Sequence, residues 1–137
     1  NIFQEMREGN FVEGGALNSF GEKFNFEGKV FKPSMKYNLL GTTMNYFIEN
    51  SILDIPDYIK IDVDGNEYLI LLGSQKTLMK KTLKSILIEL VETRKDYKDC
   101  ISIINSAGFF LKEKTHAKQF NKGKYKTTLN HIFERKS

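Results

Sequence analysis

Three short apolar runs, separated by segments with helical spacing, are the feature that most constrains the fold of this 137-residue chain. The runs cover residues 58–63, 84–91 and 109–111, and the two segments between them, 67–81 and 96–107, carry apolar residues three and four positions apart. A strand–helix–strand–helix–strand succession is typical of an open, doubly wound α/β sheet. We therefore predict an α/β fold with a mainly parallel sheet.

The last part of the chain predicts one strand that runs the other way. Residues 129–134 follow a lysine-rich loop with no helical pattern, and a parallel return would need a crossover. We therefore expect a final antiparallel strand. Ahead of the apolar runs, Thr43 precedes a short helix that ends near Asn50, and residues 1–36 predict only an irregular lead-in with a hairpin around Glu27-Gly28.

Glycines divide the predicted helices. Gly73-Ser74 interrupts the first one, and Gly108 is a natural stop for the second. In open α/β sheets ligands bind beyond the carboxyl ends of the strands. The residues that matter for function are therefore expected at 62–65 and at Glu89 and its followers, away from the helices.

Composition narrows the class of protein. Hydrophobic residues are 40% of the chain and charged residues 28%, a balance that is typical of a globular protein. The length suits one domain with a core of its own. The single cysteine, Cys100, excludes a disulfide framework and a cysteine-based zinc site, and we assign it to the core. No apolar run approaches the roughly 20 residues that span a bilayer.

The net charge of +4 is unevenly distributed along the chain. Residues 109–137 contain eight basic and two acidic residues, and the excess lies in a stretch from Lys112 to Lys126. This stretch contains no arginine, the better bidentate ligand for phosphates and bases. We favour a solvated loop and no specific nucleic-acid partner, with contact to an anionic partner as the alternative.

The peptide from Lys60 to Glu67 carries the most chemistry. Lys60 and Asp62 are two positions apart on one strand and share a face. Lys60 therefore pairs with Asp62, pairs with Glu89 on the next strand, or extends outward to solvent. The spacing of Asp62, Asp64 and the following asparagine resembles the start of an EF-hand calcium loop. The remaining positions exclude it, because Glu67 stands where glycine is required. No metal site is predicted.

Other catalytic patterns are missing from the sequence. There is no Gly-x-Ser-x-Gly elbow for a serine nucleophile. Gly14-Gly15 has neither the strand before it nor the helix after it that a phosphate loop requires. His131 alternates with apolar residues, so we expect a packed or surface histidine rather than a base.

The segment from Pro56 to Tyr68 resembles the hallmark of the FkbM family of S-adenosylmethionine-dependent methyltransferases. The family pattern is an apolar strand, then Lys-Ile-Asp-Val-Glu-Gly, a variable residue and Glu, and this chain departs from it only at Asp64. Further similar features are the Thr-Thr lead-in at 42–43, the Leu-Leu-Gly-Ser helix break, the strand around Glu89, Gly108-Phe109, and the closing pattern of Asn130, Phe133 and Arg135. The resemblance covers residues 37–135.

The resemblance implies a Rossmann-like class I methyltransferase sheet in a cytoplasmic enzyme. The reaction that it implies is O-methylation of a hydroxyl on a small-molecule or glycan acceptor, a sugar or natural product. Asp62, Lys60 and Glu67 would form the catalytic set, in which Asp62 orients or deprotonates the hydroxyl. Asp62 and Asp64 would contact the cofactor, and Glu89 and Asn130 would face the substrate.

The resemblance also implies a missing part. The family's Gly-rich cofactor turn and the acidic residue for the ribose are not in this sequence, so we expect residues 1–137 to be a single partial domain, the C-terminal half, with 37–137 as its core. Residues 58–63 would then form a sheet edge, covered by the N-terminal segment or by a second copy of the chain. A truncated or degenerate non-catalytic binding or assembly module is the alternative function.

Overall fold

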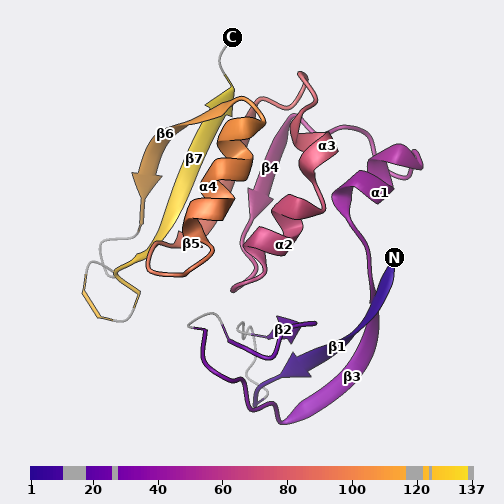
Figure 1. The fold of residues 1–137 in the computed structure, drawn as a ribbon, viewed down its shortest axis with the longest axis vertical. Coiled ribbons are helices and arrows are strands. Elements are labelled where there is room, and N and C mark those ends of the chain that lie inside the picture. The colour runs from indigo at the N-terminus through magenta and orange to yellow at the C-terminus, as the bar shows by residue number, and fades with distance from the viewer. Residues whose placement is uncertain (11–17, 26–27, 117–121, 124, 136–137) are drawn as a thin grey trace.

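The chain folds into a mixed α/β structure with two separate sheets (Figure 1). The computed structural model describes residues 1–10, 18–25, 28–116, 122–123 and 125–135. The elements in chain order are β1 (Ile2–Glu8), β2 (Ser19–Phe20), β3 (Met35–Gly41), α1 (Met44–Glu49), β4 (Tyr58–Ile61), α2 (Glu67–Leu72), α3 (Gln75–Leu78), β5 (Ser85–Val91), α4 (Tyr97–Ser106), β6 (Phe109–Thr115) and β7 (Thr128–Arg135).

The N-terminal sheet has the order β2-β1-β3 and is antiparallel. Its main ladder pairs β1 with β3 from Ile2 opposite Gly41 to Glu8 opposite Met35. The sequence does not predict these two strands, because β1 lacks a clean alternation of apolar and polar residues and β3 alternates only over Met35–Leu39. The predicted hairpin is present as a bridge between Phe24 and Val30, although part of its turn lies outside the described residues.

The second sheet has the order β4-β5-β7-β6. β4 pairs parallel with β5, whereas β7 pairs antiparallel with both β5 and β6. The expected antiparallel last strand is confirmed. The expectation of a mainly parallel sheet was wrong, because β7 inserts between β5 and β6. Of the three pairs of neighbouring strands, one is parallel and two are antiparallel. β7 returns from β6 without a crossover helix among the described residues, and such a return is antiparallel.

The helices follow the sequence signals closely. Thr43 caps α1 by accepting a hydrogen bond from the N–H of Tyr46 at 3.1 Å, and Asn50 is the C-cap. The predicted break separates α2 from α3 at Gly73, where an added Cβ would lie 2.8 Å from the Thr43 side chain. Gly108 follows α4 with a φ of +90°, which glycine adopts without strain. These three predictions are confirmed.

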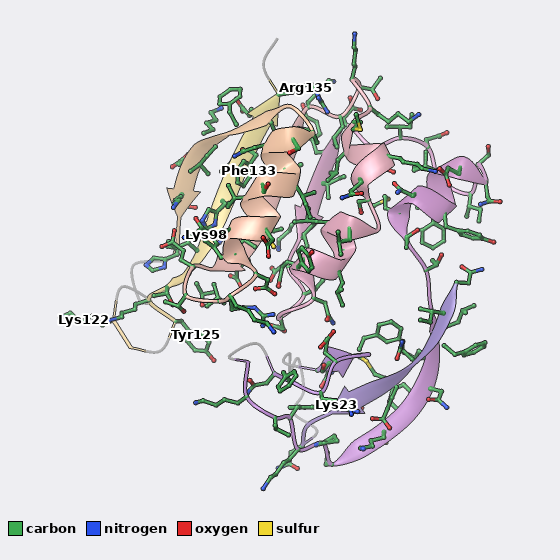
Figure 2. All side chains as sticks on the ribbon, in the orientation of Figure 1. Lys23, Lys98, Lys122, Tyr125, Phe133 and Arg135 are labelled. Atoms are coloured by element: carbon green, nitrogen blue, oxygen red, sulfur yellow. The ribbon has the colours of Figure 1, made fainter. Side chains whose placement is uncertain are left out.

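Helices α2, α3 and α4 cover one face of the second sheet (Figure 1). Alternate residues of β5, Ile86, Ile88 and Leu90, are buried on that face. Phe133 of β7 is fully buried beside them, where α4 crosses the sheet (Figure 2). Cys100 of α4 belongs to the same core, as predicted, and burial raises the pKa of its thiol to about 12. On the opposite face of β5 the side chains are only half-buried.

β4 forms an edge of this sheet, as expected. The N-terminal strands pair with one another, so in the described part of the chain no strand covers the outer side of β4. Tyr58 is 68% exposed there. The sequence suggested that either the N-terminal segment or a second copy of the chain covers this edge. The described N-terminal strands do not cover it.

Candidate functional site

The predicted pair at the end of β4 is present. The Nζ of Lys60 lies 2.9 Å from Oδ2 of Asp62, and both side chains are exposed. The hydrogen bond to Asp62 raises the pKa of Lys60, and the charge of Glu89 adds a smaller effect in the same direction. Of the two pairings that the sequence left open, the structure therefore contains the one with Asp62. The pair keeps one carboxylate oxygen of Asp62 occupied at the strand's end.

Glu67 is the first residue of α2 and is 8% exposed. Its Oε1 accepts a hydrogen bond from the N–H of Gly65 at 2.9 Å, so the side chain folds back onto the turn that leads into its own helix. Burial raises the pKa of Glu67, while the bond from Gly65 and the charge of Arg94 lower it. Glu67 therefore shapes the turn after β4.

Glu89 and Asn130 lie directly opposite each other on β5 and β7. Partial burial raises the pKa of Glu89, and the carboxylates of Asp62, Asp64 and Glu67 raise it further. The other carboxylates of the predicted site therefore act on Glu89 across the ends of β4 and β5. Since neighbouring negative charges disfavour ionisation, this end of the sheet would stabilise a proton or a cation.

A cavity of about 810 Å³ lies beside this end of the sheet. Four segments contribute to its walls: 19–25 with 28–29 from the N-terminal part, 64–66 with 68–69 after β4, 91–99 around the end of β5, and Thr127-Thr128. Of the predicted site residues, Asp64 lines it, whereas the other five do not. The position agrees with the rule that α/β sheets bind ligands beyond the carboxyl ends of their strands.

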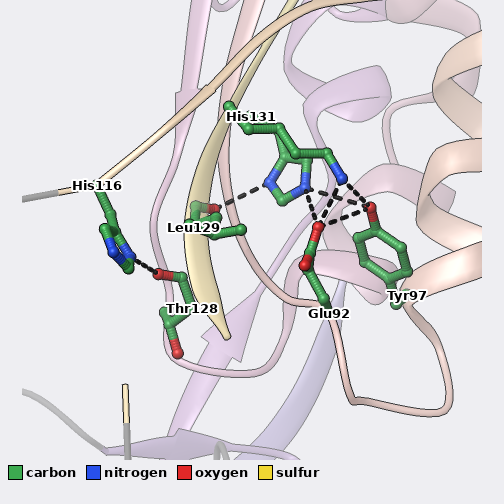
Figure 3. A network of polar contacts seen from close by, with 7 residues as sticks. Glu92, Tyr97, His116, Thr128, Leu129 and His131 are labelled. Carbon is green, nitrogen blue, oxygen red and sulfur yellow. Dashed lines mark hydrogen bonds and ion pairs between the residues drawn. The ribbon is translucent and has the colours of Figure 1, made fainter. Parts of the chain in front are cut away.

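A polar network centred on one buried side chain holds the cavity-lining loop between β5 and α4 (Figure 3). His131 is fully buried; its Nδ1 lies 2.9 Å from the carbonyl of Leu129, and its Nε2 lies 3.3 Å from the hydroxyl of Tyr97 and 3.5 Å from Oε1 of Glu92. Lys114 contacts both Glu92 and Tyr97. Glu92 and Tyr97 flank residues 93–96, so the network fixes both ends of that loop. His131 is a packed histidine, which was one of the two predicted placements.

The lysine-rich stretch is only partly described. Lys112 pairs with Glu134 and Lys114 with Glu92, which neutralises two of its charges. Lys118 and Lys124 lie outside the described residues. Within the described ranges there is no group of three or more His, Cys, Asp or Glu side chains that could hold a metal ion.

Comparison with known families decides how this geometry is interpreted. The model of the methyltransferase FkbM domain matches residues 14–111, which is more than half of the chain. The chain belongs to the FkbM methyltransferase family. No curated protein and no solved structure matches it. Among the described helices, none is long and apolar enough to cross a membrane.

Sequence reasoning missed most of the walls of the FkbM domain's cavity. Arg94 and Asp96 lie in the loop after β5. The rule that ligands bind beyond the carboxyl ends of the strands indicates this loop but does not single out these two residues. Ser19, Phe24 and Lys29 come from the N-terminal part and reach the cavity through the tertiary fold. No local pattern in residues 18–29 could have placed them there.

Proposed function

We propose that the chain forms the acceptor-side part of an S-adenosylmethionine-dependent methyltransferase that O-methylates a hydroxyl on a small-molecule or glycan acceptor in the cytoplasm. One observation carries the proposal. The acidic side chains that follow β4 raise the pKa of Glu89 on β5, next to a cavity of about 810 Å³. That residues 1–137 form a single partial domain of Rossmann-like type, with 37–137 as its core, is part of the same proposal.

The chemistry of these side chains fits a positively charged methyl donor. S-adenosylmethionine supplies a methyl group that its cationic sulfur activates. Asp62 and Asp64 are the residues that we assign to it, because a cation relieves the repulsion that raises the pKa of Glu89. The polar atoms of the cavity wall, including Thr93, Thr127 and Thr128, offer hydrogen-bond partners to a hydroxylated acceptor.

The proton of the acceptor hydroxyl is assigned to Asp62. Its Oδ2 bonds to Lys60, so Oδ1 is the atom that would accept the hydroxyl proton. A bound methyl donor would supply the methyl group, and its sulfur would keep the electron pair of the broken C–S bond. Lys60 orients the Asp62 carboxylate through its contact with Oδ2. Glu67 supports the same residue indirectly, through the turn at Gly65. Glu89 and Asn130 face each other at the adjoining strand ends and are assigned to the substrate.

The proposal is tested with Asp62→Asn. The chain offers a matched control at the other end of β4, where Asp57 forms a similarly exposed pair with Lys84 at 2.7 Å. Asp62→Asn should reduce methyl transfer from labelled S-adenosylmethionine at least a hundredfold with an unchanged melting temperature, and Asp57→Asn should leave transfer unchanged. Retained turnover in Asp62→Asn would assign Asp62 to structure. No binding of S-adenosylmethionine at millimolar concentration in calorimetry would remove the enzymatic function of this chain and favour the binding or assembly module.

We also propose that a second copy of the chain covers the outer edge of β4. The carbonyl of Asp57 bonds to the N–H groups of Lys84 and Ser85, so it points toward β5. Backbone groups alternate in direction along a strand, which turns those of Tyr58 and Lys60 outward. In an antiparallel pairing centred on Ile61, Lys60 of each copy would lie opposite Asp62 of the other.

A further inference from the structure

Two loops at the carboxyl ends of the sheet are joined by one side chain, that of Arg94. It belongs to the loop after β5, where its Nε and Nη2 donate to the two carboxylate oxygens of Asp96 at 3.0 and 2.7 Å. The same Nη2 donates to the carbonyl of Gly65, in the turn after β4, at 3.1 Å. Arg94 and Asp96 are each 18% exposed. Both residues line the cavity, so this contact ties two of its walls together.

The turn that Arg94 reaches has an uncommon backbone shape. Asp64 has a φ of +54° and Gly65 a φ of +114°. Asparagine, aspartate and glycine enter this region more readily than other residues, but it still costs aspartate conformational energy. The surroundings must therefore hold the turn. The peptide groups on the two sides of the Gly65 Cα are both bonded, with the N–H donating to Glu67 and the C=O accepting from Arg94.

Arg94 is poorly suited to bind a free anion. Its bidentate contact with Asp96 neutralises its charge, and this contact also raises the pKa of Arg94. A guanidinium is planar and offers several donors in a fixed fork, so it can hold a carboxylate and a carbonyl in one arrangement. The geometry therefore suits a structural link between the loops.

We propose that Arg94 is a positioning residue for the carboxylates that follow β4. It fixes the left-handed turn at Asp64–Gly65, and so sets Asp64 in the cavity wall and Asp62 at the end of the strand. Asp96 orients the guanidinium for this task. The effect of Arg94 on ligand binding rests on the proposed methyl transfer, whereas its effect on the turn does not.

The experiment measures the turn and the ligand separately in Arg94→Ala. Amide hydrogen exchange followed by NMR reports the turn through the N–H of Gly65, and the N–H of Gly108, which bonds to Asn105 at the other end of the sheet, is the internal control. Calorimetry with S-adenosylmethionine reports the ligand. We expect exchange at Gly65 to accelerate roughly tenfold, exchange at Gly108 to stay unchanged, and the Kd for S-adenosylmethionine to rise roughly tenfold.

Rescue distinguishes positioning from general stabilisation. Methylguanidinium added to Arg94→Ala should restore part of the affinity, whereas methylammonium should not, and Arg94→Lys should behave like the alanine variant because it lacks the fork. Lys98→Ala, which removes an exposed cation from α4, should match the wild type. If Arg94→Ala does not fold, Asp96→Asn is measured instead and should change both readouts in the same direction by less.

Each outcome decides the proposal. Unchanged exchange at Gly65, or an unchanged Kd, overturns it. So does a loss of affinity that follows the melting temperature and is not rescued. If the wild type itself does not bind S-adenosylmethionine, the proposed function fails, and exchange at Gly65 alone then decides whether Arg94 holds the turn.

Discussion

Arg135 is expected to contribute more to stability than its place near the end of the chain indicates. Its guanidinium donates to the carbonyls of Leu78 at 2.6 Å, Ala107 at 2.8 Å, Leu83 at 3.1 Å and Lys80 at 3.2 Å. These carbonyls belong to the end of α3, the end of α4 and the loop before β5. One side chain of β7, which Figure 2 labels near the end of that strand, therefore bonds to the ends of two helices and to the entry of a central strand.

The size of the effect follows from these contacts. Hydrogen bonds from a charged donor contribute about 1.5 kcal/mol each at the low end, and the three shortest are partly buried, but their contributions overlap because one group makes all of them. The guanidinium also lies 4.2 Å from the centre of the Phe109 ring, a contact that adds about 0.5 kcal/mol or more. We expect Arg135→Ala to lower the free energy of unfolding by about 3 kcal/mol, and the melting temperature by about 10 °C.

The assay is urea unfolding followed by circular dichroism, with differential scanning calorimetry as the second method. Arg135→Lys keeps the charge but not the fork and should lose most of the same stability. Lys112→Ala, which removes an exposed pair with Glu134, should leave the melting temperature nearly unchanged. An Arg135→Ala variant within about 1 kcal/mol of the wild type would refute the reasoning, because the freed carbonyls would then be fully satisfied by water.

Two further predictions concern His131 and the edge of β4. Burial lowers the pKa of His131 below its ordinary 6.5 despite the nearby Glu92, and Lys114 lowers it further. As the pH falls, His131 in the unfolded chain therefore takes up a proton at a higher pH than in the folded chain. The free energy of unfolding should fall as the pH drops below about 6.5 toward the folded-state pKa. His131→Gln should reduce this pH dependence in unfolding experiments between pH 5 and 7. The same pH dependence in the variant and the wild type would show that His131 does not cause it. For the edge, light scattering should detect a dimer that Lys60→Pro abolishes, because proline removes the outward N–H of β4. A monomer at every concentration would end the pairing proposal.

Much of the fold between residues 44 and 111 follows from local signals. The Thr43 cap and the stop at Gly108 depend on atoms within about four residues, and both lie where the sequence indicates. The alternation of a strand also places Lys60 beside Asp62. These features require no knowledge of the rest of the chain, which is why one sequence is enough to predict them.

The N-terminal sheet shows where local signals stop. β1 and β3 are separated by a long segment, and their ladder exists because the chain reverses and aligns Ile2 with Gly41. β1 has no alternation of its own and is defined by its partner, whereas β3 alternates only over Met35–Leu39. The insertion of β7 between β5 and β6 is a similar case, because strand order depends on how the whole sheet packs.

The candidate site divides along the same line. The sequence by itself determined which residues follow the strands. It therefore also determined that the carboxylates of Asp62, Asp64 and Glu67 come after β4. Only the tertiary structure decided that Glu89 lies opposite Asn130 and that Arg94 reaches the carbonyl of Gly65, 29 positions earlier in the chain. The physical reason is that periodicity and capping act over a few residues, whereas a contact between two loops depends on the register and order of the strands that carry them.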